Sequence, residues 1–277
     1  MASGFFTDTT LCIGCKACEV ACKQWNQLPA DGYEFSGNSY DNTMALGGTT
    51  WRHVAFVEQP APAGKPPTAA RWLMMSDVCK HCTHAGCLDV CPTGALFRTE
   101  FGTVVVQADV CNGCGTCVAA CPFGVIERRR DGTVAPKTDR GQQNGGQPEV
   151  LNVGVAQKCT LCYDRLLDDQ IPACAQTCPT TSIKFGDRVD MVALAKERVA
   201  QLHAQGRTEA RLYGANELDG VGGTGSVFLL LDEPEVYGLP PDPRVATADL
   251  PQMFKRAGLA AAGMAAAALI SFLGRRS

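Results

Sequence analysis

The chain has 277 residues, a formal net charge of −3 and sixteen cysteines. The slightly acidic balance argues against nucleic acid as a partner, and the length allows one or two domains. With 29 glycines and 16 prolines, the chain is expected to be rich in loops. Residues 1–10 contain no basic start and no apolar run, so no secretory signal is expected there.

The cysteines fall into four groups of four. The first and third groups read C-x2-C-x2-C-x3-C, the second reads C-x2-C-x4-C-x3-C, and the fourth reads C-x2-C-x11-C-x3-C. In chain order the groups are Cys12, Cys15, Cys18 and Cys22; Cys79, Cys82, Cys87 and Cys91; Cys111, Cys114, Cys117 and Cys121; and Cys159, Cys162, Cys174 and Cys178. Because a [4Fe–4S] cube takes four thiolates, this set predicts four [4Fe–4S] clusters with iron as the metal.

Two other uses of cysteine fit this pattern less well. Scaffold disulfides usually join distant segments, whereas these cysteines lie in closely spaced pairs and triplets. Structural zinc typically pairs two C-x2-C knuckles across a gap, and only the irregular fourth group resembles that arrangement. The compact run of four cysteines is instead the bacterial ferredoxin pattern.

The spacing has a mechanical reason. A tight cysteine loop wraps sulfurs around one cube and directs backbone N–H groups at it. We expect the fourth cysteine of each group to begin a helix-like segment, with Pro92, Pro122 and Pro179 then turning the chain. Cys22 is followed by lysine, so a helix is predicted to continue through Trp25.

In a two-cluster ferredoxin the fourth cysteine ligates the other cluster, so the groups must pair. The second and third groups are close in sequence and joined by a strand-rich connector at 95–106, which leaves the first group to pair with the fourth. The resulting hypothesis has four ligand sets: Cys12, Cys15, Cys18 and Cys178; Cys159, Cys162, Cys174 and Cys22; Cys79, Cys82, Cys87 and Cys121; and Cys111, Cys114, Cys117 and Cys91.

The predicted fold class is α+β, with two nested ferredoxin-like two-cluster units, many loops and a single C-terminal transmembrane helix. The expected segments are an outer unit at 1–75 and 150–186, an inserted inner unit at 76–149, a docking segment at 187–250 with a helix, a short strand and a linker, and a membrane anchor at 251–277.

Elements outside the cysteine loops follow in chain order. Loop-like stretches lie at 29–70, with a possible strand at 51–57, and at 132–148. A helix is predicted at 187–205, and a strand at 226–231 precedes a proline-rich linker. The apolar stripe of that helix is expected to be Val189, Val192, Ala195, Val199 and Leu202. No acid/base pair or nucleophile triad is evident, so no catalytic residue is predicted.

The C-terminal segment Ala257–Leu273 has no charged residue and basic residues on both sides. At about 1.5 Å per residue it would be roughly 26 Å long, close to the ~30 Å hydrocarbon core of a bilayer. Its many alanines make it weakly hydrophobic, so we expect an anchor that depends on a partner subunit. The alternative is a buried helix of a soluble protein, and the flanking charges leave the orientation open.

With these motifs in place, the chain resembles the iron–sulfur β subunits of membrane-bound respiratory formate dehydrogenases. These belong to the four-cluster electron-transfer subunits of molybdopterin oxidoreductases. The resemblance covers nearly the whole chain. It is carried by 12–18 with Trp25 and Asn26, 158–165, 172–180, 197–200, 220–224, and 237–243.

The resemblance implies a division of labour. A molybdopterin catalytic alpha subunit, with molybdenum or tungsten, would oxidise formate, and this chain would relay the electrons through four clusters without catalysis of its own. A membrane cytochrome b gamma subunit would pass them to quinone. The expected location is the bacterial inner membrane, with the soluble part on the periplasmic face.

Two alternatives remain open at this stage. The same relay role in a hydrogenase or another molybdopterin oxidoreductase would leave the cysteine pattern unchanged. A stand-alone enzyme or redox sensor fits less well, because a sensor usually needs one labile cluster and an output domain.

Overall fold

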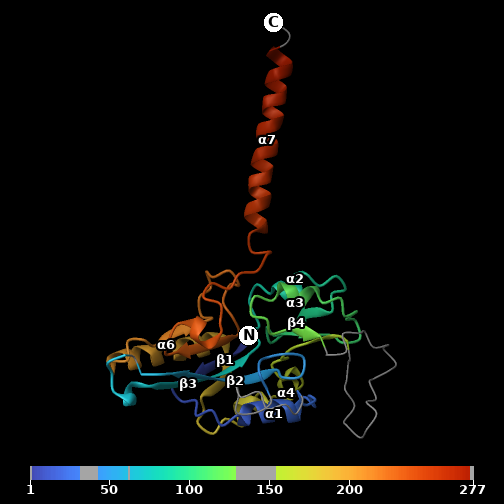
Figure 1. The fold of residues 1–277 in the computed structure, drawn as a ribbon. Coiled ribbons are helices and arrows are strands. Elements are labelled where there is room, and N and C mark those ends of the chain that lie inside the picture. The colour runs from blue at the N-terminus through green and yellow to red at the C-terminus, as the bar shows by residue number, and fades with distance from the viewer. Residues whose placement is uncertain (1, 32–42, 62, 129–153, 275–277) are drawn as a thin grey trace.

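The computed structural model describes residues 2–31, 43–61, 63–128 and 154–274. The expected loop at 132–148 lies outside the described residues. The described chain combines short helices and strands with one long C-terminal helix that projects from the body (Figure 1).

The strands are β1 (Ser3–Asp8), β2 (Arg52–Gln59), β3 (Arg71–Val78), β4 (Leu96–Arg98), β5 (Val104–Val106), β6 (Glu127–Arg128), β7 (Ala156–Gln157), β8 (Ile183–Asp187), β9 (Arg211–Tyr213) and β10 (Ser226–Leu230). The helices are α1 (Ala17–Trp25), α2 (Gly86–Asp89), α3 (Thr116–Ala120), α4 (Tyr163–Leu167), α5 (Ala173–Gln176), α6 (Arg188–Ala204) and α7 (Leu250–Gly274), with 3₁₀ turns η1 (Pro67–Ala69) and η2 (Pro234–Tyr237).

A four-stranded sheet in the order β8-β1-β10-β9 joins the two ends of the sequence. Strand β1 runs parallel to β10 and antiparallel to β8, so Phe6 lies opposite Val227 on one side and Lys184 on the other. Every residue of β10 is buried. An apolar run of this kind is typical of a strand covered on both faces. The sheet therefore holds the predicted docking segment against the N-terminus.

Two predicted strand regions are confirmed as hairpins. Strand β2 pairs with β3 along its whole length, where the sequence predicts a strand at 51–57. The connector at 95–106 folds into the β4–β5 hairpin, with Leu96 opposite Val106. The third hairpin joins β6 to β7 across a segment outside the described residues.

Helix α6 confirms the helix predicted at 187–205. Its N-cap is Asp187, whose side chain accepts a hydrogen bond from the backbone N–H of Val189. Ala195 and Leu202 are buried against the sheet, as expected from the apolar stripe. Val189 is 71% exposed, so its place in the stripe is a wrong prediction. The residue lies in the first turn, beyond the edge of the sheet that the helix covers.

The expectation that the fourth cysteine of each group begins a helix is also wrong. The third cysteine lies in a short helix, and Cys91, Cys121 and Cys178 follow the ends of α2, α3 and α5. Proline after each of these cysteines disfavours helical backbone at the preceding residue, so the helix stops before it. In the first group the helix α1 does continue through Trp25, as predicted from the lysine that follows Cys22.

The buried side chains form two apolar cores. The larger core surrounds the four-stranded sheet and includes Phe5, Phe228 and Leu202. A smaller core, with Leu96 and Ile126, lies beneath the β4–β5 hairpin and helices α2 and α3. Most cysteines of the second and third groups lie in or against the smaller core, whereas Cys79 belongs to the larger one.

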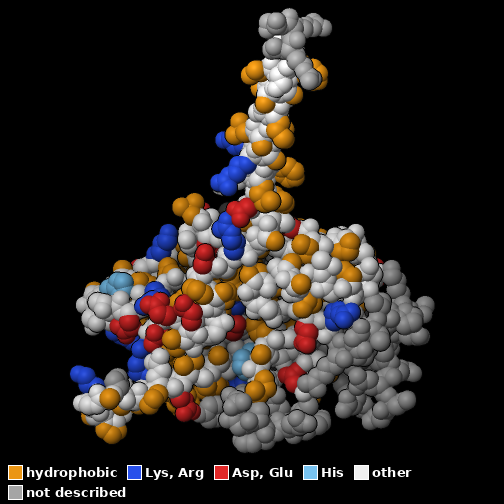
Figure 2. Space-filling model, turned by 45° about the horizontal axis from the view of Figure 1, so that its top comes forward, with side chains coloured by type: hydrophobic (Ala, Val, Ile, Leu, Met, Phe, Trp, Pro, Cys, Tyr) orange, Lys and Arg blue, Asp and Glu red, His pale blue; other side chains and the backbone are white. Residues whose placement is uncertain are grey.

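Helix α7 is the one helix of the described residues that is long and apolar enough to cross a membrane. None of the stretch Leu250–Leu273 is buried, so the alternative of a buried soluble helix finds no support. Figure 2 shows hydrophobic side chains all along the projecting helix, and basic side chains near its base.

Candidate iron–sulfur sites

Two sets of cysteines each line a small pocket. Cys12, Cys15, Cys18 and Cys178 line a pocket between the first loop and the loop after α5. We name this set site one. The fourth cysteine comes from the other end of the outer pair, which is the arrangement predicted from cross-ligation.

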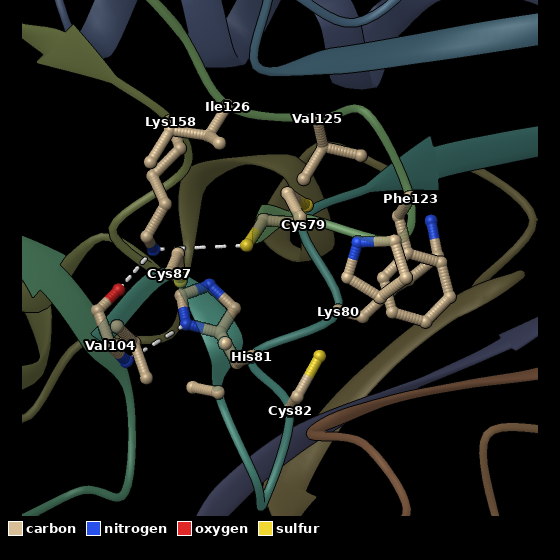
Figure 3. A pocket seen from close by; sticks show the side chains of 14 residues that line it. Cys79, Lys80, His81, Cys82, Cys87, Val104, Phe123, Val125, Ile126 and Lys158 are labelled. Atoms are coloured by element: carbon tan, nitrogen blue, oxygen red, sulfur yellow. Dashed lines mark hydrogen bonds between the residues drawn. The ribbon is translucent and has the colours of Figure 1, made fainter. Parts of the chain in front are cut away.

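Cys79, Cys82, Cys87 and Cys121 line a second small pocket, and we name this set site three. Figure 3 shows Cys79, Cys82 and Cys87 around it, together with Lys158 and His81. Phe123, Val125 and Ile126 form an apolar wall. Such a wall excludes water from a buried cofactor.

The remaining cysteines form two further groups. Burial raises the pKa of Cys22 well above its usual value, and the Cys159, Cys174 and Cys162 thiols add to the rise because they lie nearby. We name these four residues site two. Around Cys117, burial raises the pKa to about 11, and Cys111, Cys114 and Cys91 contribute. These four residues are site four.

The loops share one backbone feature. In each C-x2-C pair, the residue before the second cysteine has a left-handed backbone: Gly14, His81, Gly113 and Leu161 have φ of 66°, 45°, 71° and 60°. This turn folds both cysteines toward one point. A side chain at Gly14 would collide with Phe56, whose Cε1 would lie 2.6 Å from the added Cβ. His81 and Leu161 instead adopt a conformation that is costly for a residue with a side chain.

Hydrogen-bond donors surround the sulfur atoms. The backbone N–H of Leu161 donates to Cys159 Sγ at 3.3 Å, and that of Gly113 donates to Cys111 Sγ at 3.4 Å. Ser76 Oγ lies 3.2 Å from Cys18 Sγ. Donors of this kind stabilise the negative charge of a cluster and raise its reduction potential.

Burial makes the free thiols poor anions. It raises the pKa of Cys18 to about 12 and that of Cys162 to about 11. Thiolates in such surroundings need a positively charged centre to remain deprotonated, and iron supplies one. All sixteen cysteines are free of disulfide bonds. Together these observations fit metal ligation better than the disulfide alternative.

Neighbouring sites lie close to one another. Burial raises the pKa of Cys18 in site one, and Cys174 of site two contributes to the rise. Burial and then Cys79 of site three raise the pKa of Cys159 in site two. Burial also raises the pKa of Cys87 in site three, and Cys117 of site four contributes. Such influence requires short separations, so site one lies near site two, site two near site three, and site three near site four.

Lys158 occupies the junction between sites two and three. Its side chain is buried, and Nζ donates to Val104 O, to Cys159 O at 3.0 Å and to Cys79 Sγ at 3.7 Å (Figure 3). The sequence shows that Lys158 directly precedes Cys159, the first cysteine of the fourth group. The sequence does not show that Lys158 contacts Cys79, because the two residues are far apart along the chain.

His81 tests whether a cluster fits site three. Burial lowers the pKa of His81 well below its usual value, so the ring is neutral. Its Nδ1 accepts a hydrogen bond from the Val104 N–H at 3.1 Å, which assigns the ring proton to Nε2. That Nε2 is buried and has no partner among the described residues, and His81 lines the space of site three. A sulfur acceptor of a bound cluster would satisfy it.

The spacing of the ligands also favours a cluster over a single ion. Among the residues that the structure describes, no three His, Cys, Asp or Glu side chains converge as they would around one metal ion. A zinc ion holds its ligands at about 2.3 Å in a tight tetrahedron. The cysteines of sites one and three instead line two separate pockets, four cysteines to each.

Comparisons with known proteins agree with this geometry. Two family models, both described as "4Fe-4S dicluster domain", match the chain, one at residues 70–149 and 149–188 and the other at 11–95. The chain is thus an iron–sulfur protein built from dicluster domains, and it binds four [4Fe–4S] clusters.

Sequence relatives narrow the class. The chain is 38% identical over 242 residues to a formate dehydrogenase iron-sulfur subunit of Haemophilus influenzae, covering 86% of this chain and 68% of that protein. It is 38% identical over 244 residues to the nitrate-inducible formate dehydrogenase iron-sulfur subunit of Escherichia coli, covering 87% and 73%. The chain belongs to the family of formate dehydrogenase iron–sulfur subunits, which confirms the resemblance seen in the sequence.

A more distant relative marks the wider group. One subunit of the anaerobic dimethyl sulfoxide reductase of Escherichia coli is 32% identical over 188 residues, covering 66% of this chain and 72% of that protein. Taken together, the relatives and the clusters indicate an electron-transfer role, and helix α7 indicates membrane association. Which cysteine holds which cluster stays a prediction, and the four sites described above support it.

Proposed function

We propose that this chain is the non-catalytic electron-transfer subunit of a membrane-bound formate dehydrogenase. It would relay single electrons from a molybdopterin catalytic subunit, containing molybdenum or tungsten, toward a membrane cytochrome b and quinone. The observation that carries this proposal is the ordered row of four cysteine sites in a chain 38% identical to formate dehydrogenase iron-sulfur subunits.

The role of the protein in such a relay is electrostatic and positional. Each bound cluster supplies a centre that accepts and releases one electron. The cysteines fix where these centres lie, and the apolar wall of site three keeps water away. Backbone N–H groups and the Lys158 ammonium stabilise added negative charge. No substrate bond is made or broken by this chain in the proposal.

The exposure of the cysteines supports sites one and four as the two ends of the relay. Cys15 of site one and Cys114 of site four are exposed, whereas all four cysteines of site two are buried. The two ends of the row are therefore the sites that a partner can approach closely. Sites two and three would serve as the interior of the relay.

The second cysteine loop, which carries Cys87 of site three and Cys91 of site four, lies on the side of the membrane helix. The segment before α7 packs on α2, because a side chain added at Gly86 would lie 3.0 Å from Val245 Cγ1. Thr247 Oγ1 donates to Asp89 Oδ2 at 2.5 Å, and Asp89 stands between two cysteines of the second group. We therefore propose that electrons enter at site one, from the catalytic subunit, and leave at site four, toward the cytochrome.

The location follows the same family reasoning. We propose that α7 spans the bacterial inner membrane and that the soluble part lies on the periplasmic face. Protease treatment of spheroplasts tests the side. Digestion of the soluble part in intact spheroplasts supports the periplasmic face, and protection until lysis contradicts it.

Purification of the native complex tests the function. The chain, tagged and expressed in its own organism, should co-purify with a pterin-containing larger subunit. Formate should then reduce its clusters, seen as bleaching of visible absorption and as new low-temperature EPR signals. Clusters that remain oxidised in formate would contradict the proposal. Formate-dependent dye reduction by the isolated chain would contradict its non-catalytic part.

A second function is favoured by the similarity to the dimethyl sulfoxide reductase subunit. In that case the same row of sites would carry electrons from quinol to a reductase. Oxidation of the dithionite-reduced complex by a sulfoxide, without reduction by formate, would support this alternative. Reduction by hydrogen would indicate a hydrogenase instead.

A further inference from the structure

Arg52 is a buried cation without a counter-ion. It is 1% exposed and lies at the start of β2, opposite Val78 of β3. Its Nη1 donates to Ser76 Oγ at 3.0 Å and to Ser76 O at 3.4 Å, and its guanidinium stacks 4.8 Å from the centre of the Phe5 ring. Among the residues that the structure describes, no carboxylate forms an ion pair with it.

Two of its nitrogen atoms lack any partner. Nε and Nη2 are buried, and neither makes a hydrogen bond within the described part of the chain. Burying a charged guanidinium with free N–H groups is costly unless something nearby carries negative charge and accepts hydrogen bonds. The fold must therefore supply an acceptor that is not an oxygen or nitrogen of the described residues.

Cysteines of two sites surround Arg52. Burial by itself would lower the pKa of Arg52, but Cys174, Cys18, Cys159 and Cys22 together hold it raised. Cys18 belongs to site one, and the other three belong to site two. Ser76 Oγ accepts a hydrogen bond from Arg52 Nη1 at 3.0 Å and lies 3.2 Å from Cys18 Sγ, so the guanidinium lies beside site one. The influence of Cys174, Cys159 and Cys22 indicates that site two is also near, and a cluster with four thiolates in either site would carry net negative charge.

We propose that Arg52 is a shared positioning cation between sites one and two, which raises the reduction potentials of both clusters and donates hydrogen bonds to their sulfur atoms. A fixed positive charge stabilises the reduced cluster more than the oxidised one, because the reduced cluster carries one more negative charge. The hairpin β2–β3 holds the charge in place through Ser76. Glu19, the acid on α1, is held by Lys16 and His53 and so does not neutralise Arg52.

The proposal requires only that the clusters are present. It goes beyond the proposed function, since the potentials can be measured in the purified chain without a catalytic partner or formate. Failure of the formate experiment would leave the test of Arg52 intact.

An EPR-monitored redox titration of the isolated chain tests the proposal. Arg52→Gln removes the charge and keeps a polar side chain. The midpoint potentials of two of the four clusters should fall, by at least a tenfold change in the ratio of oxidised to reduced cluster, which is about 59 mV for one electron. Arg52→Lys keeps the charge and should recover most of that shift.

A matched control uses a surface arginine. Arg207 is 42% exposed at its side chain and pairs with Glu209, so Arg207→Gln removes one positive charge away from the sites. It should leave all four potentials unchanged. Equal shifts of the midpoint potentials in Arg52→Gln and Arg52→Lys would overturn the proposal, because Arg52 would then act through packing and not through its charge. Unchanged potentials in Arg52→Gln would overturn it as well.

A second measurement covers the case in which Arg52→Gln loses iron. The wild-type chain is labelled with ¹⁵N in arginine only, and the reduced clusters are examined by pulsed EPR for coupling to ¹⁵N. The proposal expects a coupling in the wild-type chain that disappears in Arg52→Lys. An unchanged spectrum in Arg52→Lys would overturn it, whatever the stability of the other variant.

Discussion

At the scale of single residues, the predicted cross-ligation depends on the fourth cysteine of each group. Cys22 lies in the first group by sequence but stands among Cys159, Cys162 and Cys174 in space. Helix α1 produces this separation, because it carries Cys22 a full turn beyond Cys18. Under the predicted ligand sets, the clusters would link the two halves of the chain, as the sheet does.

Replacing Cys22 by serine tests this arrangement. The change should perturb the cluster of site two and leave that of site one intact, with a loss of up to about four irons per chain. Cys162→Ser should alter the same EPR signal, whereas Cys15→Ser should alter a different one. If Cys22→Ser and Cys15→Ser affected the same signal, the ligand sets would be wrong.

At the scale of elements, the glycine-rich loop 219–225 supports the second cysteine loop. The backbone N–H of His84 donates to Val221 O at 2.8 Å, and that of Thr83 donates to Gly223 O at 3.0 Å. In sequence, the glycines of this loop offer only a weak dinucleotide-binding interpretation. The structure gives the loop a role in packing against site three, because the chain on either side of Cys82 rests on it.

Gly222 shows how close this packing is. Its φ is 69°, and an added Cβ would lie 2.4 Å from His84 Cδ2. Gly222→Ala should therefore cost more than the ~1–2 kcal/mol of a left-handed alanine, and should shorten the lifetime of the site three cluster on heating. The measurement is the rate of absorbance loss at a fixed elevated temperature.

Gly64→Ala is the matched control for this prediction. Gly64 has a φ of 80° and nothing within 4 Å of an added Cβ, so its substitution carries the backbone cost alone. The two variants losing their clusters at the same rate would show that the contact with His84 is unimportant.

The sequence predicted the elements whose signals are local. Cysteine spacing predicted the number of clusters, apolar periodicity predicted α6, and β propensity predicted the strand-rich connector that forms the β4–β5 hairpin. The proline after the fourth cysteine indicates that the helix ends before that cysteine, because proline disfavours helical backbone at the residue preceding it. This steric effect outweighs the helical tendency of the cysteine loop. Left-handed backbone at His81 and Leu161 had no such signal, because these residue types rarely adopt it.

Long-range contacts account for the rest. Strands β1 and β10 pair although Phe5 and Ser226 are more than two hundred positions apart. The sequence of either strand alone does not indicate which strand it pairs with. In the sequence, Arg52 is one polar residue in a predicted strand of alternating polar and apolar residues. Its burial between two sites depends on cysteines from both ends of the chain, so periodicity cannot reveal it.

At the scale of the whole molecule, the apolar part of helix α7 makes no packing contact with the body of the described chain. The apolar stretch of the helix packs on nothing in the described chain, whereas all four cysteine sites lie within the body (Figure 1). The segment before the helix is held to the body by Thr247 and Asp89, and Arg244 pairs with Asp249. Membrane attachment and cluster binding should therefore fail independently.

Ending the chain after Ala248 tests this independence. The shortened protein should keep about sixteen irons per chain, because no cysteine and no buried core residue is removed. It should lose its association with membranes, since the removed apolar residues are the ones that favour the bilayer. Iron analysis and fractionation after an alkaline wash measure the two properties. Expression without partner subunits is needed, because a bound membrane partner would retain the body. A truncated chain that loses its clusters would mean that the helix contributes to folding, and one that stays in washed membranes would place the attachment elsewhere.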